Sequence, residues 1–194
     1  MLMKRLALSF AFLVVCAAAF GQNHHNIYAG VSPFSSYKLY LNNDAGEKVP
    51  LNYAPYFSGS VEYQTKLKLG AINLSYFSLY ASYGKGRFDN DTAERFPTAP
   101  QTDVTDLSIN MLVGTIINEY GRFQIPLAIG PGLLMFKSGP YSDNKSYQVV
   151  AKAGVTMFIT DRLGIYAGGR LEHEFGGHKN AMFAEGGIIY SLGN

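Results

Sequence analysis

The chain has 194 residues, a length that suits a single domain. Its 16 Lys and Arg residues against 14 Asp and Glu residues give a formal net charge of +2. That balance provides no basic patch of the kind that nucleic-acid binding requires, so we predict no nucleic-acid partner. Cys16 is the only cysteine, which excludes an internal disulfide framework.

The first segment has the pattern of a secretory signal peptide. Lys4 and Arg5 form a short basic region, and an apolar run interrupted only by Ser9 follows it. This run is shorter than the roughly 20 apolar residues that a membrane-spanning helix needs. Small residues near its end predict cleavage between Gly21 and Gln22. We therefore expect a signal peptide at 1–21 and one mature domain at 22–194, exported to the bacterial envelope.

A lipoprotein signal is the alternative interpretation of this segment. It would use Cys16 as the lipid-bearing residue, but a small residue should come before that cysteine. Val15 is not small. Cleavage after Gly21 would remove Cys16 together with Lys4 and Arg5, so the mature chain would hold 14 basic and 14 acidic residues. The predicted mature protein is therefore electrically neutral and free of thiol chemistry.

The rest of the chain divides into eight strand-like segments whose connections alternate between short and long. The short connections are predicted at 68–70, 118–121 and 160–163, and the long ones at 42–50, 85–102, 137–145 and 174–180. Tight turns at one rim and longer loops at the other are typical of bacterial outer-membrane barrels. The sequence thus predicts an all-β, eight-stranded, antiparallel, up-and-down transmembrane barrel, with both termini at the periplasmic rim.

Several segments alternate between apolar and polar residues with the period of two that a barrel strand shows. The first of the eight strand-like segments is less regular, because Pro33 and a Ser pair at 35–36 interrupt its alternation. The chain also contains 14 Tyr and 13 Phe, a content that fits aromatic girdles at the membrane interfaces. On this pattern, the residues predicted to face lipid include Ile109, Met111, Leu127, Val155 and Ile165.

Charged residues in the middle of the strands fall on the opposite face. These residues are Glu62, Lys152, Arg170, Glu172 and Glu185. In a membrane barrel they would point into the lumen, whereas in a soluble lipocalin-like barrel or sandwich they would form the solvated exterior. The signal peptide, the loop pattern and the aromatic content favour the membrane barrel.

The hairpin turns predict which of these charges meet. A loop centred between residues 177 and 178 sets Arg170 opposite Glu185, and a turn centred on Asp161 sets Lys152 opposite Arg170. Unpaired buried charge costs several kcal/mol per ion, so paired groups are expected. We predict a lumen charge network of Arg170, Lys152, Glu185 and one of Glu172 or Glu62, which blocks conduction.

Two motifs add a family resemblance. The sequence YGRFQIPL at 120–127 followed by Gly130 resembles a central hairpin of uncharacterised outer-membrane β-barrel domains, and GGIIYSL at 186–192 resembles their last strand. The architecture as a whole is similar to the OmpX family and the OmpA transmembrane domain over nearly all of 22–194. The resemblance implies a barrel in the outer membrane of a Gram-negative-type cell. It also implies a monomer that contacts outer-membrane lipid and the barrel-assembly machinery, for which Tyr190 is the candidate aromatic signal.

Catalysis is not predicted. A lipid-modifying barrel would need a His beside a Ser and a carboxylate. His178 has no Ser at the adjacent positions, and the outward neighbours of His173 are Leu171 and Phe175. No further ligands accompany these two histidines, so we predict neither a metal site nor a cofactor.

The first functional hypothesis is therefore a non-enzymatic outer-membrane barrel that binds an unidentified extracellular ligand through its loops or supports envelope integrity. A narrow or gated channel is the alternative, and a lipid-modifying barrel enzyme is a remote one. Eight strands give an interior just wide enough for side chains to fill, which disfavours a permanent pore.

Overall fold

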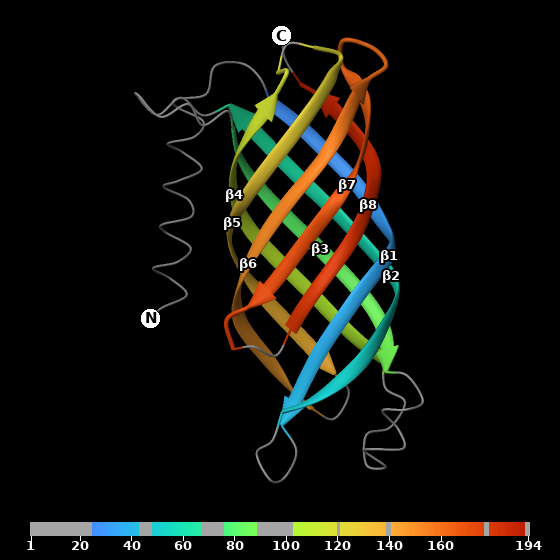
Figure 1. Ribbon diagram of the computed structural model, residues 1–194, viewed down its shortest axis with the longest axis vertical. Coiled ribbons are helices and arrows are strands. Elements are labelled where there is room, and N and C mark those ends of the chain that lie inside the picture. The colour runs from blue at the N-terminus through green and yellow to red at the C-terminus, as the bar shows by residue number, and fades with distance from the viewer. Residues whose placement is uncertain are drawn as a thin grey trace.

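The computed structural model is a closed antiparallel barrel in which each strand pairs with its neighbours in sequence and β8 pairs with β1 (Figure 1). It describes residues 25–42, 48–66, 76–88, 103–119, 121–138, 141–176 and 179–192. Within these residues, no helix is long and apolar enough to cross a membrane. The strands are β1 (His25–Asn42), β2 (Lys48–Lys66), β3 (Tyr76–Phe88), β4 (Asp103–Ile117), β5 (Phe123–Ser138), β6 (Tyr141–Phe158), β7 (Leu163–Glu174) and β8 (Lys179–Ser191).

The eight-stranded antiparallel barrel predicted from the alternation is confirmed. The predicted signal peptide and its cleavage site at Gly21 and Gln22 lie outside the described residues. The barrel closes where its last strand meets its first: the backbone N–H of Leu192 donates a hydrogen bond to the carbonyl oxygen of His25 over 2.7 Å. The beginning of β1 and the end of β8 therefore share one end of the barrel, which we call the terminal rim.

Two connections at the terminal rim have side chains suited to tight turns. Asn118 adopts a φ of 59°, a left-handed conformation that asparagine tolerates better than most residues. Its side-chain amide donates a hydrogen bond to the carbonyl oxygen of Phe123 over 2.6 Å. In the other turn, the hydroxyl of Thr160 accepts a hydrogen bond from the backbone N–H of Leu163 over 2.9 Å. These contacts fix β4–β5 and β6–β7 as hairpins.

At the opposite rim the strands extend into the predicted long connections, although the connection 89–102 remains long. The segment 137–145 was expected to be a long loop, yet β5 continues to Ser138 and β6 begins at Tyr141. Likewise β2 begins at Lys48, β3 continues to Phe88 and β8 begins at Lys179, so the expected loops at 42–50, 85–102 and 174–180 are all shorter than predicted. Backbone pairing does not require apolar side chains, so polar composition outside a hydrocarbon layer does not end a strand. The connections 67–75 and 89–102 lie outside the described residues.

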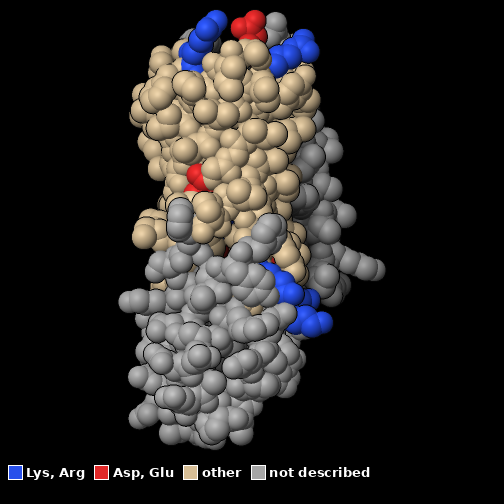
Figure 2. Space-filling model, turned by 90° about the vertical axis from the view of Figure 1, so that its right-hand side faces the viewer, with Lys and Arg blue, Asp and Glu red and all other residues tan. Residues whose placement is uncertain are grey.

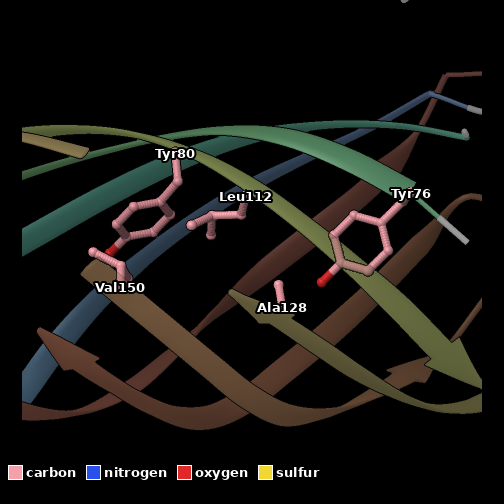
Figure 3. Packing of buried hydrophobic residues seen from close by; sticks show 5 residues of the cluster. All are labelled: Tyr76, Tyr80, Leu112, Ala128 and Val150. Carbon is pink, nitrogen blue, oxygen red and sulfur yellow. The ribbon is translucent and has the colours of Figure 1, made fainter. Parts of the chain in front are cut away.

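The barrel is apolar outside, and its interior is filled by a mixture of polar and apolar side chains. The outward face includes Ile109, Leu127, Ile129, Ile165 and Ile188, all exposed. Inside, a small apolar cluster of Tyr76, Tyr80, Leu112, Ala128 and Val150 packs between β3 and β6 (Figure 3). The remaining inward positions are largely polar, which inverts the arrangement of a soluble barrel.

Candidate functional site: the ion chain in the lumen

Seven charged side chains of alternating sign form a continuous series inside the barrel. We call this series the ion chain, and its members in order of contact are Glu62, Lys152, Glu185, Arg170, Glu172, Lys179 and Asp106. They come from β2, β4, β6, β7 and β8. The ion chain therefore ties together strands that do not all neighbour one another in the barrel wall.

The first part of the ion chain centres on Lys152. Its ammonium donates a hydrogen bond to Glu62 Oε2 over 2.6 Å and lies 3.5 Å from Glu185 Oε2. It also lies 4.4 Å from the ring centroid of Tyr80 and 4.7 Å from that of Tyr28. Aromatic faces attract cations, so the rings and carboxylates together replace the water that Lys152 loses on burial.

The second part centres on Arg170, whose side chain is only 1% exposed. Its Nη1 donates a hydrogen bond to Glu185 Oε1 over 2.5 Å, and its Nε lies 2.9 Å from Glu172 Oε1. Lys179 then donates to Glu172 Oε2 over 2.6 Å and lies 3.6 Å from Asp106 Oδ2. Each cation of the ion chain thus contacts two carboxylates.

Uncharged groups hold the carboxylates in place. The hydroxyl of Tyr80 donates to Glu185 Oε1 over 2.6 Å, and the amide of Gln64 donates to Glu62 Oε1 over 3.0 Å. Buried charges are tolerated only when their remaining lone pairs and protons find such partners. Between the ion chain and the terminal rim, Gln64, Thr156 and other residues line a cavity of about 20 Å³, a volume sufficient for one water molecule.

The structure brings all five sequence-predicted lumen residues together and includes both Glu62 and Glu172, where one of the two was expected. The predicted opposition of Lys152 and Arg170 is confirmed by the β6–β7 register. The predicted opposition of Arg170 and Glu185 is wrong, because Arg170 faces Phe183 and Glu185 faces Gly168. This shift of two residues preserves the inward parity, and the long Arg170 side chain reaches Glu185 diagonally.

Two members of the ion chain were not predicted from the sequence. Lys179 was assigned to a loop, although it shares parity with Glu185 and with the inward residues Ala181 and Phe183. Asp106 lies on the polar face of β4 but pairs with a residue of β8, and no hairpin turn predicts contacts across the lumen. Extending the period of β8 toward its beginning would have identified Lys179.

The predicted lipid-facing residues all lie on the outward parity of their strands. Ile109, Leu127 and Ile165 are exposed, whereas Met111 and Val155 are half-buried among their outward neighbours. Figure 2 shows one side of this wall, where charged side chains gather at the terminal rim and near the lower edge of the described surface. Between them the wall is almost free of charge, apart from a small acidic patch part-way down.

Of the histidines, two lie within the described residues, and the imidazole of each lies close to a polar side chain. His25 Nδ1 lies 2.8 Å from the hydroxyl of Tyr63, and His173 Nδ1 lies 2.5 Å from Asn180 Oδ1. His24 and His178 fall outside the described part of the chain. A search of the described residues finds no group of three or more His, Cys, Asp or Glu side chains placed to hold a metal ion.

Comparisons with solved structures define the class of fold. The barrel is similar to Neisserial surface protein A (TM-score 0.56, 13% identity, covering 88% of this chain and 97% of that one). It is also similar to OprG from Pseudomonas aeruginosa (TM-score 0.56, 10% identity, 90% and 98% covered). A third match is a major outer membrane protein from Thermus thermophilus (TM-score 0.52, 9% identity, 88% and 100% covered).

The fold is therefore that of the small eight-stranded outer-membrane barrels, as the resemblance to the OmpX family and the OmpA transmembrane domain predicted. No protein-family model matches the sequence, and no curated protein matches it. At these identities the likeness establishes the fold alone. The role of the barrel has to be argued from its own residues.

Proposed function

We propose that this protein is a non-enzymatic integral barrel of a Gram-negative-type outer membrane, with a lumen that the ion chain keeps closed. The observation that carries the proposal is the combination of an apolar outer wall with buried, mutually paired charges inside. Lipid can satisfy such an exterior, whereas water would leave a large apolar surface exposed. The terminal rim would face the periplasm, after export and removal of residues 1–21.

The role then belongs to the outer surfaces of the barrel. Its partners would be outer-membrane lipid along the wall, an unidentified extracellular ligand at the rim opposite the termini, and the barrel-assembly machinery during insertion. For the last of these, Tyr190 near the end of β8 is the candidate aromatic signal. Surface binding or support of the envelope by a monomer fits this arrangement better than passage of solutes.

The ion chain argues against a permanent pore. Its cations and carboxylates span the lumen and are nearly inaccessible to solvent. Opening a path through them would separate buried ion pairs, and each uncompensated charge costs several kcal/mol. The cavity beside Gln64 and Thr156 has room for about one water molecule, so it provides no continuous channel.

Planar-bilayer recording tests this proposal. The full chain after export, reconstituted in bilayers, should show no steady single-channel conductance, because the ion chain leaves no open path. Insertion is checked separately by flotation of the protein with vesicles and by the shift of the folded barrel on unheated gels. Steady conductance from inserted protein would contradict the closed lumen, and release of fatty acids from the vesicle lipids would contradict the non-enzymatic assignment.

A further inference from the structure

The outer wall carries three lysines side by side near the rim opposite the termini. Lys85 of β3 and Lys137 of β5 both pair with Thr105 of β4, one from each side. Lys145 of β6 pairs with Met135, which places it diagonally next to Lys137 on the same face. We call Lys85, Lys137 and Lys145 the lysine patch.

The lysine patch belongs to the outer wall and not to the lumen. Lys137 and Lys145 are exposed, Lys85 is half-buried, and each shares the outward parity of its strand. Among the described side chains on the outward face of β3 to β6, none is acidic. Asp106, next to Thr105 in the sequence, points into the lumen toward Lys179. Figure 2 shows Lys and Arg side chains gathered at the end of the described wall opposite the terminal rim. This part of the wall therefore concentrates positive charge.

Exposed tyrosines mark the height of the lysine patch on the wall. Tyr83 precedes Lys85 by two residues and Tyr147 follows Lys145 by two, so both tyrosines lie on the outward face and nearer the terminal rim. They are 43% and 54% exposed. Tyrosine prefers the boundary between hydrocarbon and headgroups, because its ring is apolar and its hydroxyl stays wet. In a membrane, the lysine ammonium groups would then lie at the level of the lipid headgroups.

The wall between the lysine patch and the terminal rim is apolar. Leu107 pairs with Tyr83, and Ile109 lies two residues further along β4 on the same outward face. A ligand that fits both levels therefore combines an anionic headgroup with apolar chains. Lys85 and Lys137 lie two strands apart, which separates their backbones by about 10 Å. That width exceeds a single phosphate group, so a headgroup with two separate phosphates fits the lysine patch better.

We propose that the lysine patch and the apolar wall beside it bind an outer-leaflet lipid whose headgroup carries two phosphate groups. The phosphates accept charge-assisted hydrogen bonds from the lysine ammonium groups, and the acyl chains lie along Leu107 and Ile109. The hydroxyl of Thr105, between two of the lysines, is a further donor for a phosphate oxygen. This inference rests on the proposed function, because it requires the wall to lie in lipid with the lysine patch on the extracellular side.

Native mass spectrometry of the full exported chain, folded in detergent micelles, tests the proposal with bisphosphorylated lipid A as the probe. The folded protein should retain lipid A. Monophosphorylated lipid A with the same acyl chains should bind about fivefold more weakly, the effect of one charge contact at a lipid headgroup. Inorganic phosphate should not displace the lipid. Equal binding of the two lipids, or displacement by inorganic phosphate, would overturn the site.

Charge-removing variants locate the contact. Lys137→Gln and Lys145→Gln should each weaken lipid A binding about fivefold. Arg122→Gln and Arg162→Gln remove exposed cations at the terminal rim, so they serve as matched controls and should leave binding unchanged. Folding of every variant is checked by its shift on unheated gels.

Two results would overturn the lysine patch as the site: unchanged binding by the lysine variants, or an equal loss in the arginine variants. Failure of the wild-type chain to insert into phosphatidylcholine vesicles would count against the proposed function. Inserted protein that binds no lipid A would count against this site alone.

Discussion

Replacing Arg170 with Met should lower the free energy of unfolding by about 3–5 kcal/mol, the cost of breaking a buried ion pair from one side. The substitution removes the shared partner of Glu185 and Glu172, both of which stay buried. Each would then be left with one cation, Lys152 or Lys179. Urea unfolding of the folded barrel in vesicles measures the change.

A half-buried ion pair of the same protein, more accessible to water than the ion chain, provides the control. Lys66 Nζ lies 3.1 Å from Glu119 Oε1 at the terminal rim, and their side chains are 20% and 24% exposed. Lys66→Met should cost only about 0–1 kcal/mol, because water screens this pair in both states. Comparable losses for Arg170→Met and Lys66→Met would show that the ion chain contributes no more than a surface contact.

A double-mutant cycle isolates the contact between Arg170 and Glu185. Arg170→Met and Glu185→Gln should couple by about 0.5–3 kcal/mol, the range for residues that share a network. The double variant should therefore lose less stability than the two single variants summed. Strict additivity would mean that the two side chains do not act together in the folded barrel.

Placing an arginine at Ile109 should cost about 2–4 kcal/mol, the penalty for a cation on the lipid face near the bilayer midplane. Ile109 is 41% exposed, lies in the middle of β4 and points outward. Ile117 also points outward. It is the last residue of β4 and therefore lies at the terminal rim. Ile117→Arg is therefore the matched control and should cost about 0–1 kcal/mol.

The same unfolding assay in vesicles measures both variants. Equal costs at Ile109 and Ile117 would mean that depth along β4 does not matter, as on a barrel surrounded by water.

Asn110 is unsuitable as the control, although it neighbours Ile109. Its side chain is fully buried and hydrogen-bonded to Ser108 and Gln148, so an arginine there would fail for lack of space.

The number of strands and the face of each side chain could be predicted from the sequence, because a period of two leaves a clear pattern. Ile109 and Arg170 fell on their correct faces without any knowledge of tertiary contacts. The exact pairing of β7 with β8 could not be predicted, since a two-residue change in the turn moves the register but leaves every face unchanged. Arg170 thus meets Phe183 directly and Glu185 only diagonally.

The extent of the strands was the weaker part of the prediction. Residues such as Lys179 look like loop residues because their surroundings are polar, yet they belong to strands that continue past the apolar band. Asp106 shows a second limit, because its contact with Lys179 crosses the lumen and depends on how the whole barrel closes. Pro33 shows a third: it marked an irregularity in the first strand, but the register shift of the β1–β8 pairing between Val31 and Phe34 depends on the partner strand.

The central claim is that the outer wall lies in lipid, and spin-label accessibility tests it most directly. Single cysteines at Ile109 and at Asp161, an exposed turn residue of the terminal rim, would carry the label after reconstitution in vesicles. The label at Ile109 should be relaxed strongly by oxygen, which concentrates in hydrocarbon, and weakly by a water-soluble nickel complex. The label at Asp161 should show the reverse. A label at Ile109 that the nickel complex relaxes as strongly as the one at Asp161 would contradict a membrane-embedded barrel.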